Sequence, residues 1–132
     1  MTLMPDAELV VTAYVRSHPS LPPGVVVASG WEGFAAGQTR AVLTRAGGGL
    51  PVRQRIDRAR IDVEVVAPTK AGAVTAISAV RHMLAEAPGH RVPGVAVVTD
   101  TQEESGPAYI EDPGSDQPRY VASWMVDVRP DP

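Results

Sequence analysis

The chain has 132 residues, of which 44% are hydrophobic and 5% aromatic, which fits one domain with a core of Val, Ala, Ile and Leu. Charged residues make up 20%, and the formal net charge of −3 excludes the strongly basic character of a general DNA-binding protein. The absence of cysteine excludes disulfides and thiolate metal sites. The sequence has no apolar run of membrane-spanning length and no signal-peptide pattern, so we expect a soluble protein, made in the cytoplasm, that does not bind membranes.

Hydrophobic periodicity predicts elements in the order helix, three strands, helix, three strands. The first helix is expected from Pro5 to Ser17, where a proline-rich segment stops it. Its apolar stripe consists of Leu3, Ala7, Val10, Val11 and Tyr14. Two β-rich runs follow, Val25–Ser29 and Arg40–Arg45, and each predicts a short strand.

The segment Ile56–Ala67 gives the clearest strand and is expected at the centre of the sheet. Apolar and charged residues alternate along it, which indicates one buried and one solvated face. The apolar positions are Ala59, Ile61, Val63, Val65 and Ala67, and the charged positions are Arg58, Arg60, Asp62 and Glu64. Three consecutive glycines, Gly47–Gly49, precede this strand and are expected to form a flexible turn.

A second helix is expected from Lys70 to Ala87, with Thr69 as its N-cap. Its buried stripe consists of Ala73, Ile77, Val80 and Leu84, supported by Val74 and Met83. Strands are then expected at Gly94–Asp100 and Ala108–Asp112, joined by the polar segment "TQEESGP", and at Arg119–Arg129.

Hairpins before and after a helix predict the fold class. The expected architecture is α+β, a mostly antiparallel β-sheet with two main helices packed on one face. The chain shows neither an internal repeat nor a linker, so residues 1–132 are expected to form a single domain.

The glycines raise the question of a phosphate-binding loop, because Gly47–Gly49 lie among arginines. A Walker loop needs a Lys that reaches the phosphates and a Ser or Thr that holds magnesium. Here Leu50, Pro51 and Val52 follow the glycines, and the glycines do not open a helix. The pattern therefore favours a turn between strands over a nucleotide site.

No residue pattern calls for catalysis. The histidines His18, His82 and His90 lack metal-ligand spacing, and neither a serine elbow nor a Ser-x-x-Lys motif occurs. The paired carboxylates lie in a segment rich in Gly and Pro, where acids are usually solvated. We therefore expect no catalytic residue, no cofactor and no metal, and a protein that is not an enzyme.

The charges are unevenly distributed along the chain. Six arginines and a single acid, Asp57, lie between Arg40 and Arg60, whereas six acids and no Lys or Arg lie between Thr99 and Asp116. These segments can be two solvated sheet faces, complementary surfaces that meet between subunits, or, for the arginines, a nucleic-acid site. The candidate interface residues are Arg45, Arg53, Arg55, Arg58, Arg60, Asp100, Glu103, Glu104, Glu111 and Asp112.

A resemblance extends over nearly the whole chain. Its parts are the opening "DAELVVTAYVRSHP", the "LTRAGGG" segment, "RARIDVEVVAP" followed by "TKAGAVTAISAVRHML", and the closing "GVAVVTDTQEESGPAYIEDPGSDQPRYVASWMVDVRP". In pattern and order these segments resemble the tail terminator, or tail-to-head joining, proteins of long-tailed bacteriophages. That family has no catalytic residues to carry over.

The resemblance implies a structural role in a virion. Members form a ring, here expected to be a homohexamer, that caps the tail tube and stops its polymerisation. The implied partners are further copies of the chain, the tail tube protein and a head-side connector, with DNA passing through the lumen without specific binding. The implied location is the head-proximal end of the tail, and the host cytoplasm before assembly.

Other functions remain open from the sequence. A head-closure, neck or minor tail protein of the same virion region would share the size and class. A small nucleic-acid-binding module could use Arg40–Arg60, and a small enzyme or ligand-binding domain could place a site near Trp31 and Phe34.

Overall fold

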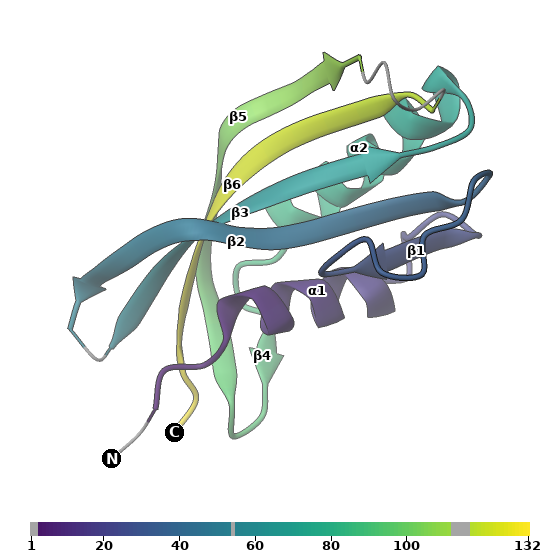
Figure 1. The fold of residues 1–132 in the computed structure, drawn as a ribbon. Helices are drawn as coiled ribbons and strands as arrows, with labels where there is room; N and C mark the ends of the chain where they lie inside the picture. The colour runs from purple at the N-terminus through teal and green to yellow at the C-terminus, as the bar shows by residue number, and fades with distance from the viewer. Residues whose placement is uncertain (1–2, 54, 112–116) are drawn as a thin grey trace.

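A computed structural model, which describes residues 3–53, 55–111 and 117–132, shows a curled sheet with two helices packed on one face (Figure 1). Within these residues the sheet has six strands in the order β1-β2-β3-β6-β5-β4. Only β1 and β2 pair in parallel. The predicted α+β class is confirmed. The elements are α1 (Ala7–Ser17), β1 (Val25–Ala28), β2 (Thr39–Val52), β3 (Ile56–Val66), α2 (Lys70–Ala85), β4 (Arg91–Val92), β5 (Ala96–Ile110) and β6 (Arg119–Pro130).

The core lies between the helices and one face of the sheet, and β3 is at its centre as predicted. Ala59, Ile61, Val63 and Val65 of β3 are at most 1% exposed. β6 contributes Trp124, Val126 and Val128 to the same core, and these residues are the register partners of Ile61, Ala59 and Asp57 on β3.

No described helix packs on the other face of the sheet, which we call the uncovered face. Arg40, Val42 and Val66 are buried there, and the loop between β1 and β2 binds Arg40, whereas Arg58, Arg60, Asp62 and Glu64 of β3 are charged.

The helix caps are the ones that the sequence supports, with small differences in length. The Asp6 carboxylate accepts a hydrogen bond from Leu9 N–H at 3.1 Å, so α1 begins after Pro5 rather than at it. The Thr69 hydroxyl accepts from Gly72 N–H at 3.0 Å, as predicted. Two stripe assignments are wrong: Leu3 precedes α1 and is 77% exposed, and Val74 lies on the solvent side of α2.

β2 is much longer than predicted and runs through the three glycines. Gly48 pairs with Ala59 and Gly49 with Arg58 after a register shift, and the chain reverses only beyond Val52. Gly48 has φ +109°, and a Cβ on it would lie 1.9 Å from the Arg58 carbonyl oxygen. The prediction of a turn at the glycines is therefore wrong, because glycine serves here to carry a bulged strand past its neighbour.

β5 is one long strand where two were predicted. β6 pairs with it from Ala96 to Ile110, and the register shifts near Ser105 absorb the "SGP" step. The polar segment "TQEESGP" was predicted as a loop because it lacks the apolar alternation of a strand. Much of β5 lies at an edge of the sheet and has no apolar face to bury, so no such alternation is needed. The two-residue β4 was not predicted, and Asp112 lies outside the described residues.

The hairpin of β2 and β3 extends beyond the helices as a two-stranded projection (Figure 1). We call its outer part, residues 46–53 and 55–56, the arm. Apart from the half-buried Ile56, all of these residues are exposed. The arm is therefore held by pairing between its strands and by contacts at its base, rather than by a core of its own.

The C-terminus is tied to the turn between β4 and β5 by Asp131. Its Oδ2 accepts hydrogen bonds from Arg91 Nε at 2.7 Å and from Gly94 N–H at 2.8 Å. The Arg91 guanidinium, and after it the Gly94 N–H, hold the pKa of Asp131 below its ordinary value of 3.8. The end of β6 is thereby fixed beside the start of β5.

Replacing Gly48 by Ala should destabilise the protein by about 2 kcal/mol or more, because the new methyl group meets backbone atoms at a positive φ. Urea unfolding measures this free energy. Gly49→Ala is the matched control, since nothing lies within 4 Å of the position that its methyl group would take; it should be neutral or stabilising by up to about 1 kcal/mol. Equal effects of the two substitutions would contradict the account of the bulge.

The contribution of Asp131 should depend on pH. Because its folded-state pKa is lowered, the carboxylate stabilises the fold above its unfolded pKa, and this is lost as pH falls through the folded pKa. Urea unfolding should therefore show a stability gap between the wild type and Asp131→Asn that is full at pH 7 and shrinks below about pH 4. A gap of the same size at about pH 3 would contradict the assignment.

Candidate functional site

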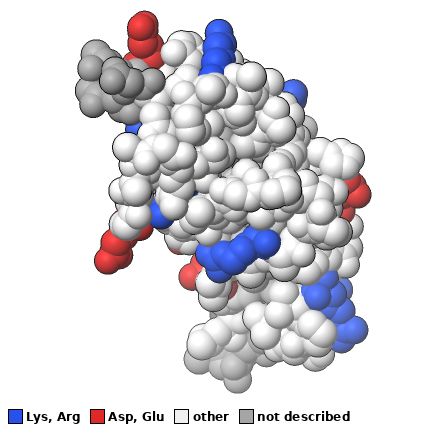
Figure 2. Space-filling model, turned by 90° about the vertical axis from the view of Figure 1, so that its right-hand side faces the viewer, with Lys and Arg blue, Asp and Glu red and all other residues white. Residues whose placement is uncertain are grey.

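On one face of the molecule, charged side chains are dispersed rather than gathered by sign. On the face shown in Figure 2, Lys and Arg stand apart from one another, separated by uncharged surface, with acidic side chains at the margins. The sequence segregation of arginines and acids therefore does not translate into one broad basic patch on that face.

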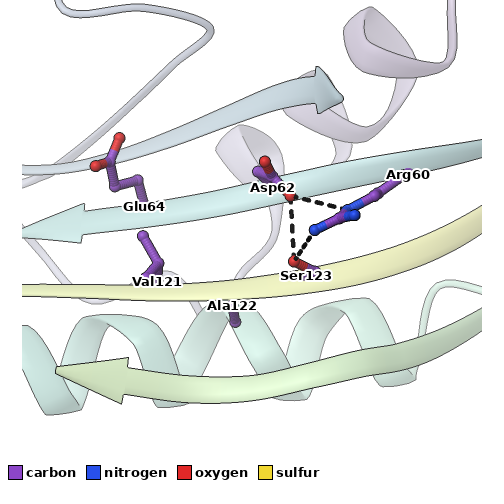
Figure 3. Close-up of a pocket in the computed structure, with 6 residues that line it drawn as sticks. All are labelled: Arg60, Asp62, Glu64, Val121, Ala122 and Ser123. Carbon is purple, nitrogen blue, oxygen red and sulfur yellow. Dashed lines mark hydrogen bonds and ion pairs between the residues drawn. The ribbon is translucent and has the colours of Figure 1, made fainter. Parts of the chain in front are cut away.

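The uncovered face of the sheet carries a charged network centred on β3. Arg60 Nε lies 3.4 Å from Asp62 Oδ1, and Ser123 of β6 donates to the same carboxylate oxygen at 3.2 Å (Figure 3). Arg60 Nη2 donates to Ser123 Oγ at 3.3 Å. The alternation predicted for β3 is confirmed, and its charged residues bind one another and the neighbouring strand.

This network borders an open hollow of about 320 Å³. The hollow is lined by Arg60, Asp62, Glu64, Val121, Ala122 and Ser123 (Figure 3). Glu64 also pairs with Arg119 at 3.1 Å. The Ser123 hydroxyl accepts from the Arg60 guanidinium and donates to the Asp62 carboxylate. The hollow thus has the chemistry of an ion-pair network at the surface.

Arg45 lies on the helix-covered face, at the base of the arm. It forms a bidentate ion pair with Asp57 at 2.5 and 2.7 Å, and the Asp57 side chain is only 6% exposed. This hydrogen-bonded pair raises the pKa of Arg45. The Arg45 N–H donates to Glu8 of α1 at 2.8 Å, and its Nε donates to the Gly47 carbonyl at 3.0 Å. Arg45 therefore fastens the arm to the first helix.

Further candidate residues are paired within the chain, and one of these pairs, Arg60 with Glu104, joins the two charged segments of the sequence. Arg58 binds Asp127 of β6 through two hydrogen bonds of 2.9 and 3.1 Å. Arg60 Nε lies 3.9 Å from Glu104 of β5. Glu103 turns to the helix face and pairs with Arg81 of α2. Three of the candidate arginines, Arg45, Arg58 and Arg60, thus have partners in their own chain.

The remaining candidate residues are left available. Arg53 and Arg55 are exposed at the end of the arm, and neither side chain has a partner among the described residues. Asp100 is exposed opposite Asp127 on β5, and Glu111 is exposed just beyond β5. Leu50 and Val52 of the arm are 50% and 41% exposed.

The partners Asp57, Asp127 and Glu8 were not singled out from the sequence. Asp57 is the one acid in a segment with six arginines. A single acid among so many arginines could have indicated that Asp57 forms a buried ion pair. Asp127 lies between apolar residues on a strand, and this spacing indicates a side chain that faces away from the core. The spacing does not indicate which strand lies beside it.

Trp31 and Phe34 form a cluster with arginines in the loop between β1 and β2. Their rings meet edge to face at 5.5 Å, Arg119 lies 5.4 Å from the Trp31 ring centre, and Arg40 lies 5.8 Å from that of Phe34. Arg40 is 5% exposed and donates to the carbonyls of Gly30 and Glu32, each at 2.9 Å. These contacts give the cluster a role in holding the loop.

The histidines also lie in local contacts. The rings of His18 and His90 both contact the Tyr14 ring, the first edge to face and the second tilted. His82 pairs with Glu86 one turn along α2. In the described ranges, no three His, Asp or Glu side chains are placed to hold a metal ion. Neither described helix is long and apolar enough to cross a membrane.

Comparison with known proteins gives no relative on which to base a function. No protein-family model matches the chain. No curated protein matches it either.

The arginines of the arm and of its base should differ in their effect on folding. Arg45→Ala leaves the buried Asp57 carboxylate without its guanidinium and should cost about 2 kcal/mol of unfolding free energy. The double variant Arg53→Ala, Arg55→Ala removes exposed side chains and should change it by under about 0.5 kcal/mol per site. Chemical denaturation of both variants measures the difference. A large loss in the double variant would mean that the arm arginines serve the fold.

Proposed function

We propose that the protein is a structural subunit that assembles head to tail into a ring and terminates the tail of a long-tailed bacteriophage. The observation that carries the proposal is the arm. It extends beyond the helices, exposes Leu50 and Val52, and ends in two arginines that have no side-chain partner within the described part of the chain. A projection of this kind buries little apolar surface within its own chain, and it suits a contact with another molecule.

The α+β fold supports the same proposal. A sheet with one uncovered, polar face and two different ends gives each subunit unlike surfaces. Unlike surfaces on one molecule produce head-to-tail contacts, which close into a ring when the rotation between subunits allows it. The whole-chain resemblance to tail terminators is what selects a tail ring, expected to be a hexamer, among the possible assemblies.

The proposed ring would sit at the head-proximal end of the tail tube. Its partners would be the tail tube protein on one side and the head connector on the other, and DNA would pass through the lumen. The chain carries an excess of acid, with a formal net charge of −3, which disfavours strong binding of a passing phosphate backbone. A head-closure or minor tail protein of the same region is the alternative that shares these features.

The arginine contacts weaken the case for a nucleic-acid-binding module. Of the six arginines from Arg40 to Arg60, all but Arg53 and Arg55 are hydrogen bonded or ion paired within the chain. Phosphate binding that uses these side chains would have to break those contacts. Only the two arm arginines remain for such a role.

Tail tubes assembled from the tube protein of the same genome test the proposal. Adding the purified chain should stop elongation and place a ring at one tube end, visible by negative-stain electron microscopy. Tubes without the chain are the control and should keep growing. Continued growth in excess chain, with bare tube ends, would exclude a terminator, whereas rings that bind the head connector but not the tube would indicate the head-closure alternative.

A further inference from the structure

The arm offers a small surface of defined chemistry. Leu50 and Val52 are its exposed apolar side chains, and Arg53 and Arg55 follow at its end. Residues 46–56 contain no acid, and the nearby Asp57 carboxylate is ion paired with Arg45. Whatever the arm contacts should therefore combine apolar and acidic groups.

A second surface on the chain has that complementary chemistry. It lies along β5 and its end, and we call it the β5 rim. Ile110 is 44% exposed, and residues 92–118 contain no Lys or Arg. Tyr109 is engaged within the chain by the Tyr120 ring and by Lys70, and Asp100 lies in the same row as Arg58 and Asp127. The β5 rim therefore consists of Glu104, Ile110 and Glu111.

The β5 rim is also free of covering strands. β4 pairs only with Ala96 and Val97, so from Thr99 to Ile110 the outer edge of β5 has no neighbouring strand in the described part of the chain. The acids there are weakly engaged within the chain: the nearest cation to Glu104 is Arg60, at 3.9 Å. The rim can thus accept a partner without first losing strong contacts.

The arm and the β5 rim cannot meet within one chain. β2 and β5 lie on opposite flanks of the sheet, separated by β3 and β6. The arm projects from one end of the strands, whereas Ile110 and its register partner Arg119 lie at the other end (Figure 1). A contact between the two surfaces therefore joins two copies, and it joins unlike patches.

We propose that the arm of one copy docks on the β5 rim of a second copy. Leu50 and Val52 pack against Ile110, and Arg53 and Arg55 pair with Glu104 and Glu111. This contact rests on the proposed assembly into a ring, for which it names the two surfaces.

The contact is made by side chains rather than by adding a strand. On the arm, Pro51 has no N–H to donate, and near its base the Arg45 N–H already binds Glu8. On the rim, two register shifts interrupt the strand between Glu103 and Ala108. Both edges are therefore poor templates for continuous strand pairing, while their side chains are exposed.

Cysteine cross-linking tests the contact directly, because the chain has no cysteine of its own. Val52→Cys and Ile110→Cys are made as separate proteins, one with a size tag, then mixed and oxidised. A disulfide-linked heterodimer should form on a non-reducing gel, at several times the yield of the control. The control is Val74→Cys mixed with Ile110→Cys, since Val74 on α2 is 41% exposed, the same fraction as Val52.

Two outcomes would overturn the contact. One is a yield no higher than that of the Val74→Cys control. The other is a predominant Val52→Cys homodimer, which would mean that like surfaces meet. The cross-linking uses the free protein, so it separates this inference from the proposed function: capped tubes without the cross-link would reject the contact alone, and the cross-link without capped tubes would reject the terminator alone.

Charge exchange gives a second test of the same contact. Arg53→Glu, Arg55→Glu should lower the heterodimer yield several-fold, and so should Glu104→Lys, Glu111→Lys. Mixing these two reversed surfaces should restore the yield, because opposite charges face each other again. Glu32→Lys, an exposed acid in the loop before β2, is the matched control and should leave the yield unchanged. No restoration in the doubly reversed mixture would overturn the pairing of arm and rim.

Discussion

The buried ion pair of Arg45 and Asp57 marks the boundary between the covered sheet and the free arm. The Asp57 carboxylate is almost fully enclosed, and an enclosed carboxylate needs the two hydrogen bonds that the guanidinium donates. Through the Arg45 N–H, the same residue is held by Glu8, at the start of α1. This linkage joins the covered core to the base of the arm, because it ties β2, β3 and α1 to one another.

The arginines of the central segment divide into two groups with different physical roles. Those at the base and on the uncovered face are bound by acids or carbonyls of the same chain, and they hold strands and a loop together. Those at the end of the arm have no such partner in the described residues. A charge that is exposed, unpaired and displaced from the core contributes little to folding. In the proposed assembly these arginines meet another surface, and this difference is the basis for the proposal.

The sequence predicted the covered parts of the fold well and the projecting parts badly. The alternation of apolar residues on β3 and the apolar stripe of α2 both arise because these elements are buried against each other. Burial on one face produces a periodic pattern of apolar residues in the sequence. The glycines of β2 and the polar stretch of β5 lie where no core imposes a period, so strand residues there resemble a turn or a loop. The register shift at Gly48 and the continuous pairing of β5 with β6 arise from neighbouring strands. The candidate charges could be named from the sequence, but their partners could not, because the pairing depends on strand order.

The α+β class, the central strand, the N-cap of α2 and the positions of the charged residues follow from the sequence alone. They obey local rules: periodicity, capping side chains and composition act on neighbours along the chain. The three-dimensional arrangement settles which arginines are engaged and which are free, where the hairpin turns, and that the arm and the β5 rim lie at opposite ends of one sheet. The reason is that ion pairs, bulges and edges depend on which distant strands lie side by side, and many strand orders are compatible with the same local pattern.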